Sequence, residues 1–204
     1  MGDTRDAYTD VENVFLPVGV GVFVLVALAI LTLVVLGRRR REPSRRKNNV
    51  PLELAIVAVL AVAAGTLVTV SFSAEDRVGE ARASAPLKVR VVAAKWRWRF
   101  EYPAQGKVVQ GGDGEAPALV VPAGTPVEIE GVSLDVVHAF WVPELRFQRQ
   151  LFPNRPTRFV MTFPEPGILP GGRCSMFCGL RHQDMHFVVD VRPAAEFETW
   201  VSAR

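Results

Sequence analysis

The chain has 204 residues, of which 49% are hydrophobic, and it carries a formal net charge of +3. This content is too apolar for an ordinary soluble domain of this size, so membrane-spanning segments are expected. The excess positive charge comes largely from one short loop between two apolar runs, and it therefore gives no indication of nucleic-acid binding.

Two uncharged apolar runs predict transmembrane helices over residues 14–36 and 54–72. At about 1.5 Å per residue, helices of this length cross a hydrocarbon core of roughly 30 Å. Buried core helices are the alternative, but uncharged runs this long are rare in soluble domains. We therefore expect residues 1–72 to form a transmembrane helical hairpin.

The loop between the two runs, residues 37–53, is strongly basic, whereas most of the charged residues within residues 1–13 are acidic. The basic residues are Arg38, Arg39, Arg40, Arg41, Arg45, Arg46 and Lys47. The positive-inside rule keeps this loop in the cytoplasm and places both termini on the external side. Because the positive charges follow the first apolar run, we interpret that run as a retained anchor rather than a signal peptide. The arginine-rich composition favours a bacterial cytoplasmic membrane.

Residues 73–86 are small, polar and without periodicity, which predicts a linker, and residues 87–204 then form an external domain. In that domain Trp96, Trp98, Phe100 and Tyr102 alternate with charged residues, as in a half-buried strand. Further short β-prone runs are separated by Gly and Pro turns. The pattern predicts an all-β sandwich or barrel, followed by a short helix after Pro193.

The strongest chemical signal is a C-x3-C-x3-H-x2-M run formed by Cys174, Cys178, His182 and Met185. Thiolate, imidazole and thioether donors together favour copper over hard cations. His138, on a predicted strand far from this run, is the natural completing ligand. The run has one thiolate too many for a single copper ion of the cupredoxin type, and two bridging thiolates suit a pair of copper ions.

Two other interpretations of the cysteines stay open at this point. Cys174 and Cys178 could form a disulfide, because the domain is expected to face an oxidising compartment. Two cysteines and two histidines are also a familiar set of zinc ligands.

The sequence resembles subunit II of cytochrome c oxidases. The shared features are the two N-terminal spans, the aromatic motif from Trp96 to Pro103, the S-x-D-V-x-H-x-F-W-V-P-x-L segment from Ser133 to Leu145, and the cysteine run. The resemblance covers most of the chain and implies a cupredoxin-like outer domain with a binuclear copper centre, CuA, and no heme in this chain.

The resemblance also implies a role for each ligand. Cys174 and Cys178 bridge the copper ions, His138 and Met185 complete one of them, and His182 binds the other together with a backbone carbonyl. That carbonyl belongs to Met176, where family members commonly have a Glu that reaches a magnesium ion; Met176 has no oxygen to offer it. His186 is expected to point away from the side chain of Met185 and to be structural or exposed.

Two further residues have implied roles with plain alternatives. Trp96 corresponds to the position at which electrons from a docked cytochrome c arrive in the family, although an aromatic on this strand would serve core packing equally well. Glu53, at the cytoplasmic start of the second span, corresponds to a proton-uptake position in many members. A carboxylate that only favours the helix dipole is the alternative.

The implied function is electron input to a respiratory heme-copper oxidase. An external cytochrome c-type donor would reduce the copper centre, and subunit I, accompanied by other integral subunits and lipid, would reduce oxygen to water and translocate protons. A nitric oxide reductase with the same copper centre and a membrane-anchored copper-delivery protein are the alternatives. The stretch Arg146–Gln150 departs from the family, and Arg173 and Arg181 flank the cysteine run, so the donor is expected to be acidic, neutral or tethered.

Overall fold

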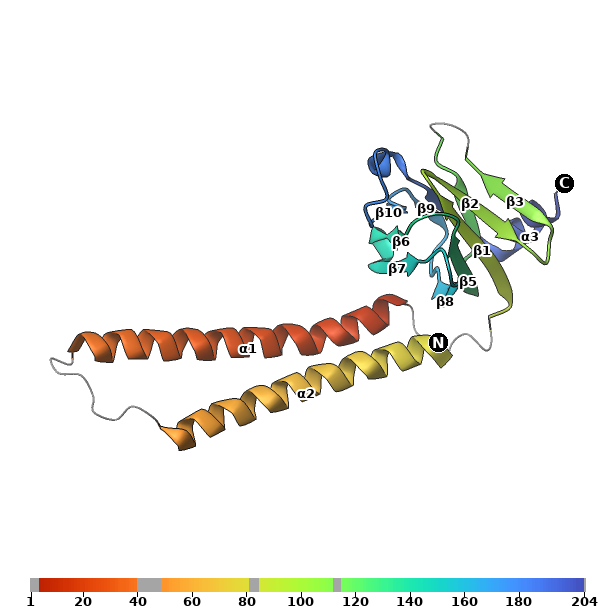
Figure 1. Cartoon of the computed structure of the whole chain (residues 1–204). Helices are drawn as coiled ribbons and strands as arrows, with labels where there is room; N and C mark the ends of the chain where they lie inside the picture. The colour runs from red at the N-terminus through yellow and green to blue at the C-terminus, as the bar shows by residue number, and fades with distance from the viewer. Residues whose placement is uncertain (1–3, 40–48, 81–84, 112–114, 204) are drawn as a thin grey trace. The chain divides into compact units, whose positions relative to one another are not determined.

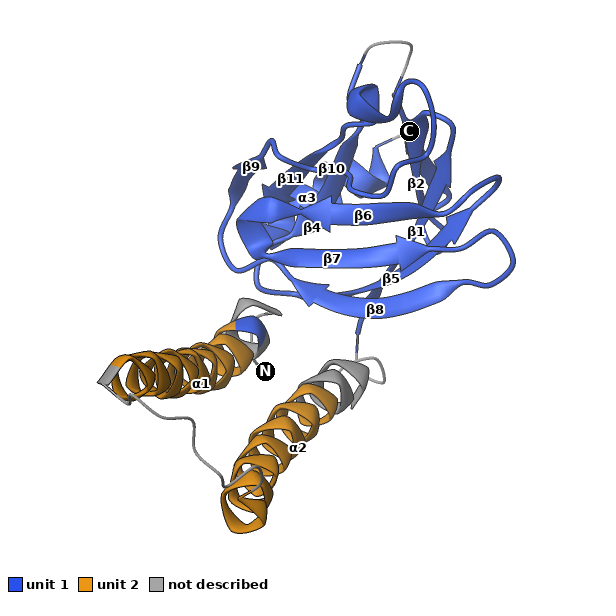
Figure 2. Ribbon diagram, turned by 60° about the vertical axis from the view of Figure 1, so that its left-hand side comes forward, with its two compact units in different colours: residues 1–8, 76–204 blue, residues 9–75 orange. Residues whose placement is uncertain are grey.

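The computed structural model of the chain describes residues 4–39, 49–80, 85–111 and 115–203. The chain divides into two compact units (Figure 1 and Figure 2). One unit is Thr9–Glu75 and contains most of two long helices, whereas the other comprises Met1–Tyr8 and Asp76–Arg204 and contains the β-rich outer domain.

The two helices are α1, Thr4–Arg39, and α2, Val50–Glu80. Their segments Tyr8–Arg38 and Val50–Ser73 have mean hydropathies of 3.0 and 2.4, and both are long and apolar enough to cross a membrane. The predicted spans lie inside them. Helix α2 continues through residues 73–80, which the sequence assigned to the linker, because Ala, Glu and Arg favour a helix there. Most of the predicted basic loop, residues 40–48, lies outside the described residues.

Polar side chains of α2 satisfy their hydrogen bonds within the helix. The hydroxyls of Thr66, Thr69, Ser71 and Ser73 each donate to the carbonyl four residues earlier, at 2.8 to 2.9 Å. In a hydrocarbon environment an unsatisfied hydroxyl is costly. These bonds therefore make the second helix compatible with lipid on all sides.

Three sheets form the outer domain. The largest has the order β3-β2-β1-β5-β8, in which β1 and β5 run parallel. The second has the order β10-β6-β7, and the third the order β4-β11-β9. The strands are β1 Leu87–Ala94, β2 Arg97–Tyr102, β3 Lys107–Gln110, β4 Ala118–Pro122, β5 Pro126–Ser133, β6 His138–Val142, β7 Phe147–Leu151, β8 Thr157–Thr162, β9 Gly167–Leu169, β10 Arg173–Cys174 and β11 Val188–Arg192. Short 3-10 helices η2 (Pro143–Leu145) and η3 (His182–Asp184) and the C-terminal helix α3 (Ala194–Ser202) complete it.

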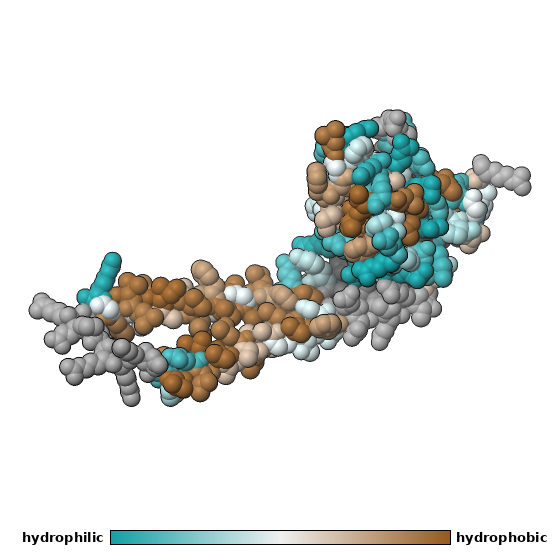
Figure 3. Space-filling view, viewed as in Figure 1, coloured by the Kyte–Doolittle hydropathy of each residue, from teal (hydrophilic) through white to brown (hydrophobic). Residues whose placement is uncertain are grey.

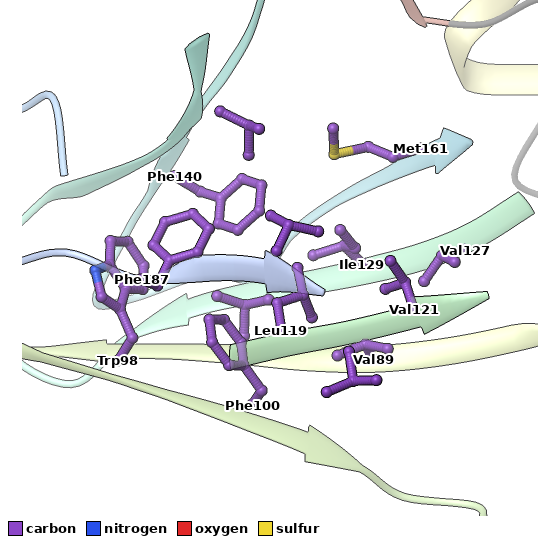
Figure 4. Close-up of a cluster of buried hydrophobic side chains, with 14 of the residues drawn as sticks. Val89, Trp98, Phe100, Leu119, Val121, Val127, Ile129, Phe140, Met161 and Phe187 are labelled. Carbon is purple, nitrogen blue, oxygen red and sulfur yellow. The ribbon is translucent and has the colours of Figure 1, made fainter. Parts of the chain in front are cut away.

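One apolar core joins the inner faces of these sheets (Figure 4). Phe140 and Phe187 stack with ring centroids 4.8 Å apart, and Trp98 packs its edge against both. The expected alternation in β2 is confirmed, because Trp98, Phe100 and Tyr102 are fully buried. Trp96 is not in the strand: it lies in the turn between β1 and β2 and is half-buried.

Tyr102 connects the largest sheet to the third sheet. Its hydroxyl donates to the carbonyl of Val120 at 2.7 Å and accepts the N–H of Val120 at 2.9 Å. Burial raises the pKa of this phenol, so it stays neutral and remains a donor. Both backbone groups of Val120 in β4 are thus satisfied by one side chain of β2.

Replacing Tyr102 by Phe should therefore destabilise the outer domain by about 1–3 kcal/mol, since it leaves a buried N–H and C=O of Val120 without partners. Urea unfolding of the outer domain measures this loss. Val108→Ala, at an exposed side chain of β3, is the control and should change the free energy of unfolding by less than about 0.5 kcal/mol. Equal stability of the two variants would contradict the role given to the hydroxyl.

Candidate metal centre

The cysteine run forms a loop that is anchored at both ends. Cys174 ends β10, which pairs with β6 so that Cys174 lies opposite Phe140. Its N–H donates to the carbonyl of Met185 at 3.0 Å, and the indole N–H of Trp98 donates to the same carbonyl at 3.3 Å. The loop from Ser175 to Met185 is therefore closed onto the core at the point where Met185 is buried.

The predicted ligands come together around this closure. The Nδ1 atom of His138 lies 3.7 Å from the sulfur of Cys174, and the carbonyl of Met176 lies 3.2 Å from that sulfur. The sulfur of Cys178 lies 3.5 Å from Nδ1 of His182 and 3.9 Å from the sulfur of Met185. The ligand atoms of His138, Cys174 and Cys178 all lie within 4.8 Å of one another, and all three residues are buried.

Both cysteines are free thiols in this structure. The disulfide alternative is therefore not the arrangement that the fold adopts. Because a metal-binding cysteine must be a thiolate, the free and buried state is the one that a metal site requires.

The two thiols differ in how easily they ionise. Burial opposes ionisation of Cys174, but His138 and the backbone of Ala139 and Met176 outweigh it, so the pKa of Cys174 is lowered. Burial and the neighbouring Cys174 raise the pKa of Cys178 to about 12. The pocket therefore stabilises the thiolate of Cys174, whereas Cys178 needs a nearby cation in order to ionise.

Asp135 fixes the orientation of His138. Its carboxylate lies 2.8 Å from Nε2 of His138 and also accepts the backbone N–H groups of Val136 and Lys95. Burial would raise the pKa of Asp135, but these contacts lower it. Burial likewise disfavours a charged His138, yet contacts with Cys174 and Asp135 raise its pKa. An Nε2–H donated to Asp135 leaves Nδ1 as the lone-pair atom that faces the thiols.

Trp96 lies directly against the cysteine loop. A Cβ atom added to Gly179 would lie 3.2 Å from Cζ2 and 3.4 Å from Nε1 of its indole, and Gly179 has a φ of +120°. The indole therefore packs on the backbone of the residue that follows Cys178. The sequence motif gave no role to Gly179, and only its position after the second cysteine could have drawn attention to it.

The sequence also drew attention to His186 and Glu53. His186 is exposed and the preceding Met185 is buried, as expected, although β11 begins only at Val188 and His186 forms an isolated bridge with Arg173. Glu53 lies in the first turn of α2, where its carboxylate accepts the N–H of Asn49 at 3.4 Å. This contact is what a helix cap provides.

Comparisons with known proteins agree with this geometry. Residues 115–192 match the family described as cytochrome C oxidase subunit II, periplasmic domain. A Synechocystis protein described as cytochrome c oxidase subunit 2 is 32% identical over 118 residues, 58% of this chain and 33% of its own length. A Corynebacterium diphtheriae protein of the same description is 38% identical over 96 residues, 44% of this chain and 26% of its own. The matched region thus spans a third or less of these relatives.

A solved structure shows the same fold. The periplasmic domain of cytochrome oxidase subunit II from Bradyrhizobium japonicum is 26% identical with a TM-score of 0.52, and the match covers 58% of this chain and 92% of that one. The outer domain is similar in sequence and fold to the periplasmic domain of cytochrome c oxidase subunit II. The expected cupredoxin-like fold is therefore confirmed.

This similarity bears on two properties of the chain. Subunit II domains normally bind copper, and the described residues contain a His and Cys group suited to a metal. A domain of a periplasmic family joined to two helices long and apolar enough to cross a membrane indicates a membrane-anchored protein with an external domain.

Asp135→Asn should weaken copper binding by the outer domain about 10-fold or more, because the predicted ligand His138 loses the charged partner that fixes its tautomer. In the metal-free domain the pKa of His138 should fall, which NMR titration of its imidazole measures. Glu144→Gln is the matched control, since that carboxylate accepts the N–H of Gly171 at 2.8 Å and touches no ligand. Copper affinities that fall equally in both variants would contradict the role of Asp135.

Gly179→Ala should displace the indole of Trp96 in the metal-free domain, because the new methyl group would lie 3.2 Å from it. The fluorescence contributed by Trp96, obtained by difference from Trp96→Phe, should become more accessible to acrylamide. Gly124→Ala adds a methyl group at a φ of +67° with nothing within 4 Å, and it controls for backbone strain. An unchanged Trp96 signal in the Gly179 variant would rule out the contact.

Proposed function

We propose that the chain is the electron-input subunit II of a respiratory heme-copper oxidase and that its outer domain holds a binuclear CuA centre. The observation that carries the proposal is the convergence of two free, buried thiols with two imidazoles, a thioether and a backbone carbonyl. Soft donors of this kind select copper. A tetrahedral zinc site of two thiolates and two imidazoles would leave the thioether of Met185 without a role.

The two thiolates, together with the other donors, would hold the copper ions. The proposed ligands are His138, Cys174, the carbonyl of Met176, Cys178, His182 and Met185. His138 and Met176 lie nearest Cys174, whereas His182 and Met185 lie nearest Cys178. These contacts bring together all the residues that would hold the copper ions.

Copper ions bound here would supply a site that gains and loses one electron. The residues around them would keep that site rigid and dry, so that little must move when its charge changes. Trp98 holds the carbonyl of Met185 and packs edge-on against His138, with ring centroids 6.4 Å apart. Phe140 and Phe187 are fully buried behind it and exclude water.

The proposal places the copper domain and both termini on the external side of a bacterial cytoplasmic membrane. A cytochrome c-type protein would be the donor, and the acceptor would be subunit I, which reduces oxygen to water and translocates protons. The similarity of the outer domain to subunit II supports these partners, and the two apolar helices support contact with lipid and integral subunits. Trp96, packed on Gly179, would be the position at which electrons arrive.

Two further residues belong to the same proposal, and only the first departs from the family pattern. Met176 would provide only its carbonyl, so this chain would supply no magnesium ligand at that position. Glu53 would serve proton uptake at the cytoplasmic start of α2. Its contact with Asn49 also suits a helix cap, so a role in proton uptake requires that Glu53→Gln slows turnover without unfolding the helix.

Electron paramagnetic resonance of the copper-loaded outer domain tests the centre. One unpaired electron shared between two copper nuclei should give a seven-line hyperfine pattern. Cys174→Ser should abolish that pattern, because a hydroxyl cannot replace a bridging thiolate, whereas the exposed His186→Ala should leave it intact. A four-line spectrum, or loss of the signal in the His186 variant, would contradict the proposed ligands.

Turnover of the purified complex tests the acceptor. We expect it to consume oxygen with a reduced cytochrome c as donor, and Trp96→Phe should slow this consumption strongly while the copper spectrum stays intact. Consumption of nitric oxide alone would assign the chain to the reductase class. A copper protein that exchanges a single ion and copurifies with no heme would instead be a delivery protein.

A further inference from the structure

The thioether of Met185 is the weakest donor among the proposed copper ligands. A weak axial thioether does not hold itself in place, yet it tunes the reduction potential of a soft-metal site. The side chain of Met185 is buried, and its sulfur lies 3.9 Å from the sulfur of Cys178. The position of this sulfur must therefore be set by the protein around it.

The backbone of Met185 lies at a junction between two elements. It follows the 3-10 helix η3, and β11 begins only at Val188. Its N–H donates to the carbonyl of His182 at 3.3 Å, and its carbonyl accepts the N–H of Cys174 at 3.0 Å. Both of these partners belong to the cysteine run, so these two bonds close the run on itself.

The indole of Trp98 ties this junction to the largest sheet. Its N–H donates to the same carbonyl of Met185 at 3.3 Å. Trp98 lies in β2 and pairs with Ala93 of β1. A buried indole N–H needs an acceptor, so this bond fixes the indole and the carbonyl relative to each other.

The indole is itself held by the core. Trp98 is fully buried, and its ring packs edge-on against Phe140 and Phe187, with centroids 6.2 and 5.2 Å away (Figure 4). Figure 3 shows many hydrophilic residues over the outer domain, and this aromatic cluster lies beneath that surface. Close packing leaves a side chain little room to move. Trp98 is therefore a rigid support for the cysteine loop.

The two tryptophans of the aromatic motif differ in what their indoles contact. The buried Nε1 of Trp96 has no hydrogen-bond partner among the described residues, and its ring packs on Gly179. Trp98 instead donates to Met185 and meets the ring of His138 edge-on, with centroids 6.4 Å apart. Trp98 thus contacts two of the proposed ligands, one through its N–H and one through its ring.

We propose that Trp98 is a positioning residue that sets the reduction potential of the copper centre through its hydrogen bond to Met185. This role rests on the proposed electron-input function and assigns control of its potential to a residue that is not a ligand. Contacts beyond the ligands orient them and tune the metal. Without the indole N–H, the backbone of Met185 loses its bond to the sheet, and the thioether can withdraw from Cys178. The centre should then resemble one that lacks the thioether.

The test compares reduction potentials of the copper-loaded full chain by spectroelectrochemical titration. Trp98 is replaced by benzothienylalanine, which keeps the shape of the indole but has sulfur in place of the N–H, so the core stays filled. Met185→Leu removes the thioether and gives the reference direction. We expect the Trp98 substitution to shift the potential in the same direction by a smaller amount. An unchanged potential, or a shift in the opposite direction, would overturn the proposal.

Phe100→Leu is the matched control for packing. Phe100 lies two residues further along β2, is fully buried and packs against Phe187 with centroids 5.6 Å apart. This change loosens the same aromatic cluster but leaves the indole hydrogen bond in place, so it should shift the potential less than the Trp98 substitution does. A shift of equal or larger size in the control would assign the effect to packing and overturn the proposal.

A double substitution separates Met185 from His138 as the route of the effect. If Trp98 acts through Met185, its replacement in the Met185→Leu chain should shift the potential little further, because both changes affect one contact. A shift of full size in that chain would mean that Trp98 acts through the ring of His138 or through packing. Either result would refute the role of the hydrogen bond.

The metal-free full chain gives a readout that does not depend on copper. Methionines with isotope-labelled methyl groups report local mobility by NMR, and Met185→Leu identifies the signal of Met185. The Trp98 substitution should narrow this signal and move it toward the shift of a free methionine, because the side chain gains freedom. A Met185 signal that does not respond would contradict the contact.

Failure of this inference is distinguishable from failure of the proposed function. If the unsubstituted chain gives the seven-line spectrum and the Trp98 substitution leaves the potential unchanged, only the role of Trp98 is wrong. If the unsubstituted chain gives no binuclear copper spectrum, the electron-input function is wrong, and the control of its potential by Trp98 is wrong with it.

Discussion

The carboxylate of Asp135 is the contact on which the arrangement of the metal centre depends. It binds Nε2 of His138 and the backbone N–H of Lys95, so it joins the proposed ligand on β6 to the turn that carries Trp96. Trp96 in turn packs on Gly179 of the cysteine loop. One carboxylate at the surface of the domain thus fixes the tautomer of the proposed ligand His138 and holds the turn that carries Trp96. Displacing Asp135 should therefore disturb both residues.

The sequence was sufficient to predict the features that depend on periodicity and ligand chemistry. Long apolar runs predicted α1 and α2, alternation predicted the inward face of β2, and donor type predicted which side chains would gather. His138 is separated from Cys174 by more than thirty residues, yet its Nδ1 atom lies 3.7 Å from the sulfur of Cys174. That part was predictable because a soft-metal site restricts which residues can complete it.

The parts that escaped prediction depend on tertiary contacts. The strand β7 has a polar, half-exposed pattern and exists because β6 supplies its hydrogen bonds, and β10 is only two residues long. Gly179 is important because a side chain at this position would collide with the indole of Trp96, and no local sequence pattern predicts that contact. Trp96 belongs to the aromatic motif but lies in a turn, because β1 and β2 pair only as far as Ala94 and Arg97.

The fold also controls how the metal centre would be loaded. Burial holds the pKa of Cys178 at about 12, so near neutral pH this thiol keeps its proton until a cation replaces it. Cys174, whose pKa is lowered by His138, is the thiol that ionises first. A cation that arrives at Cys174 and His138 then lowers the cost of ionising Cys178, and binding at both cysteines releases a proton. Copper affinity should therefore rise with pH for as long as Cys178 is protonated in the metal-free protein. The contact of the metal with Cys174 forms readily, whereas its contact with Cys178 becomes favourable only once the metal is bound.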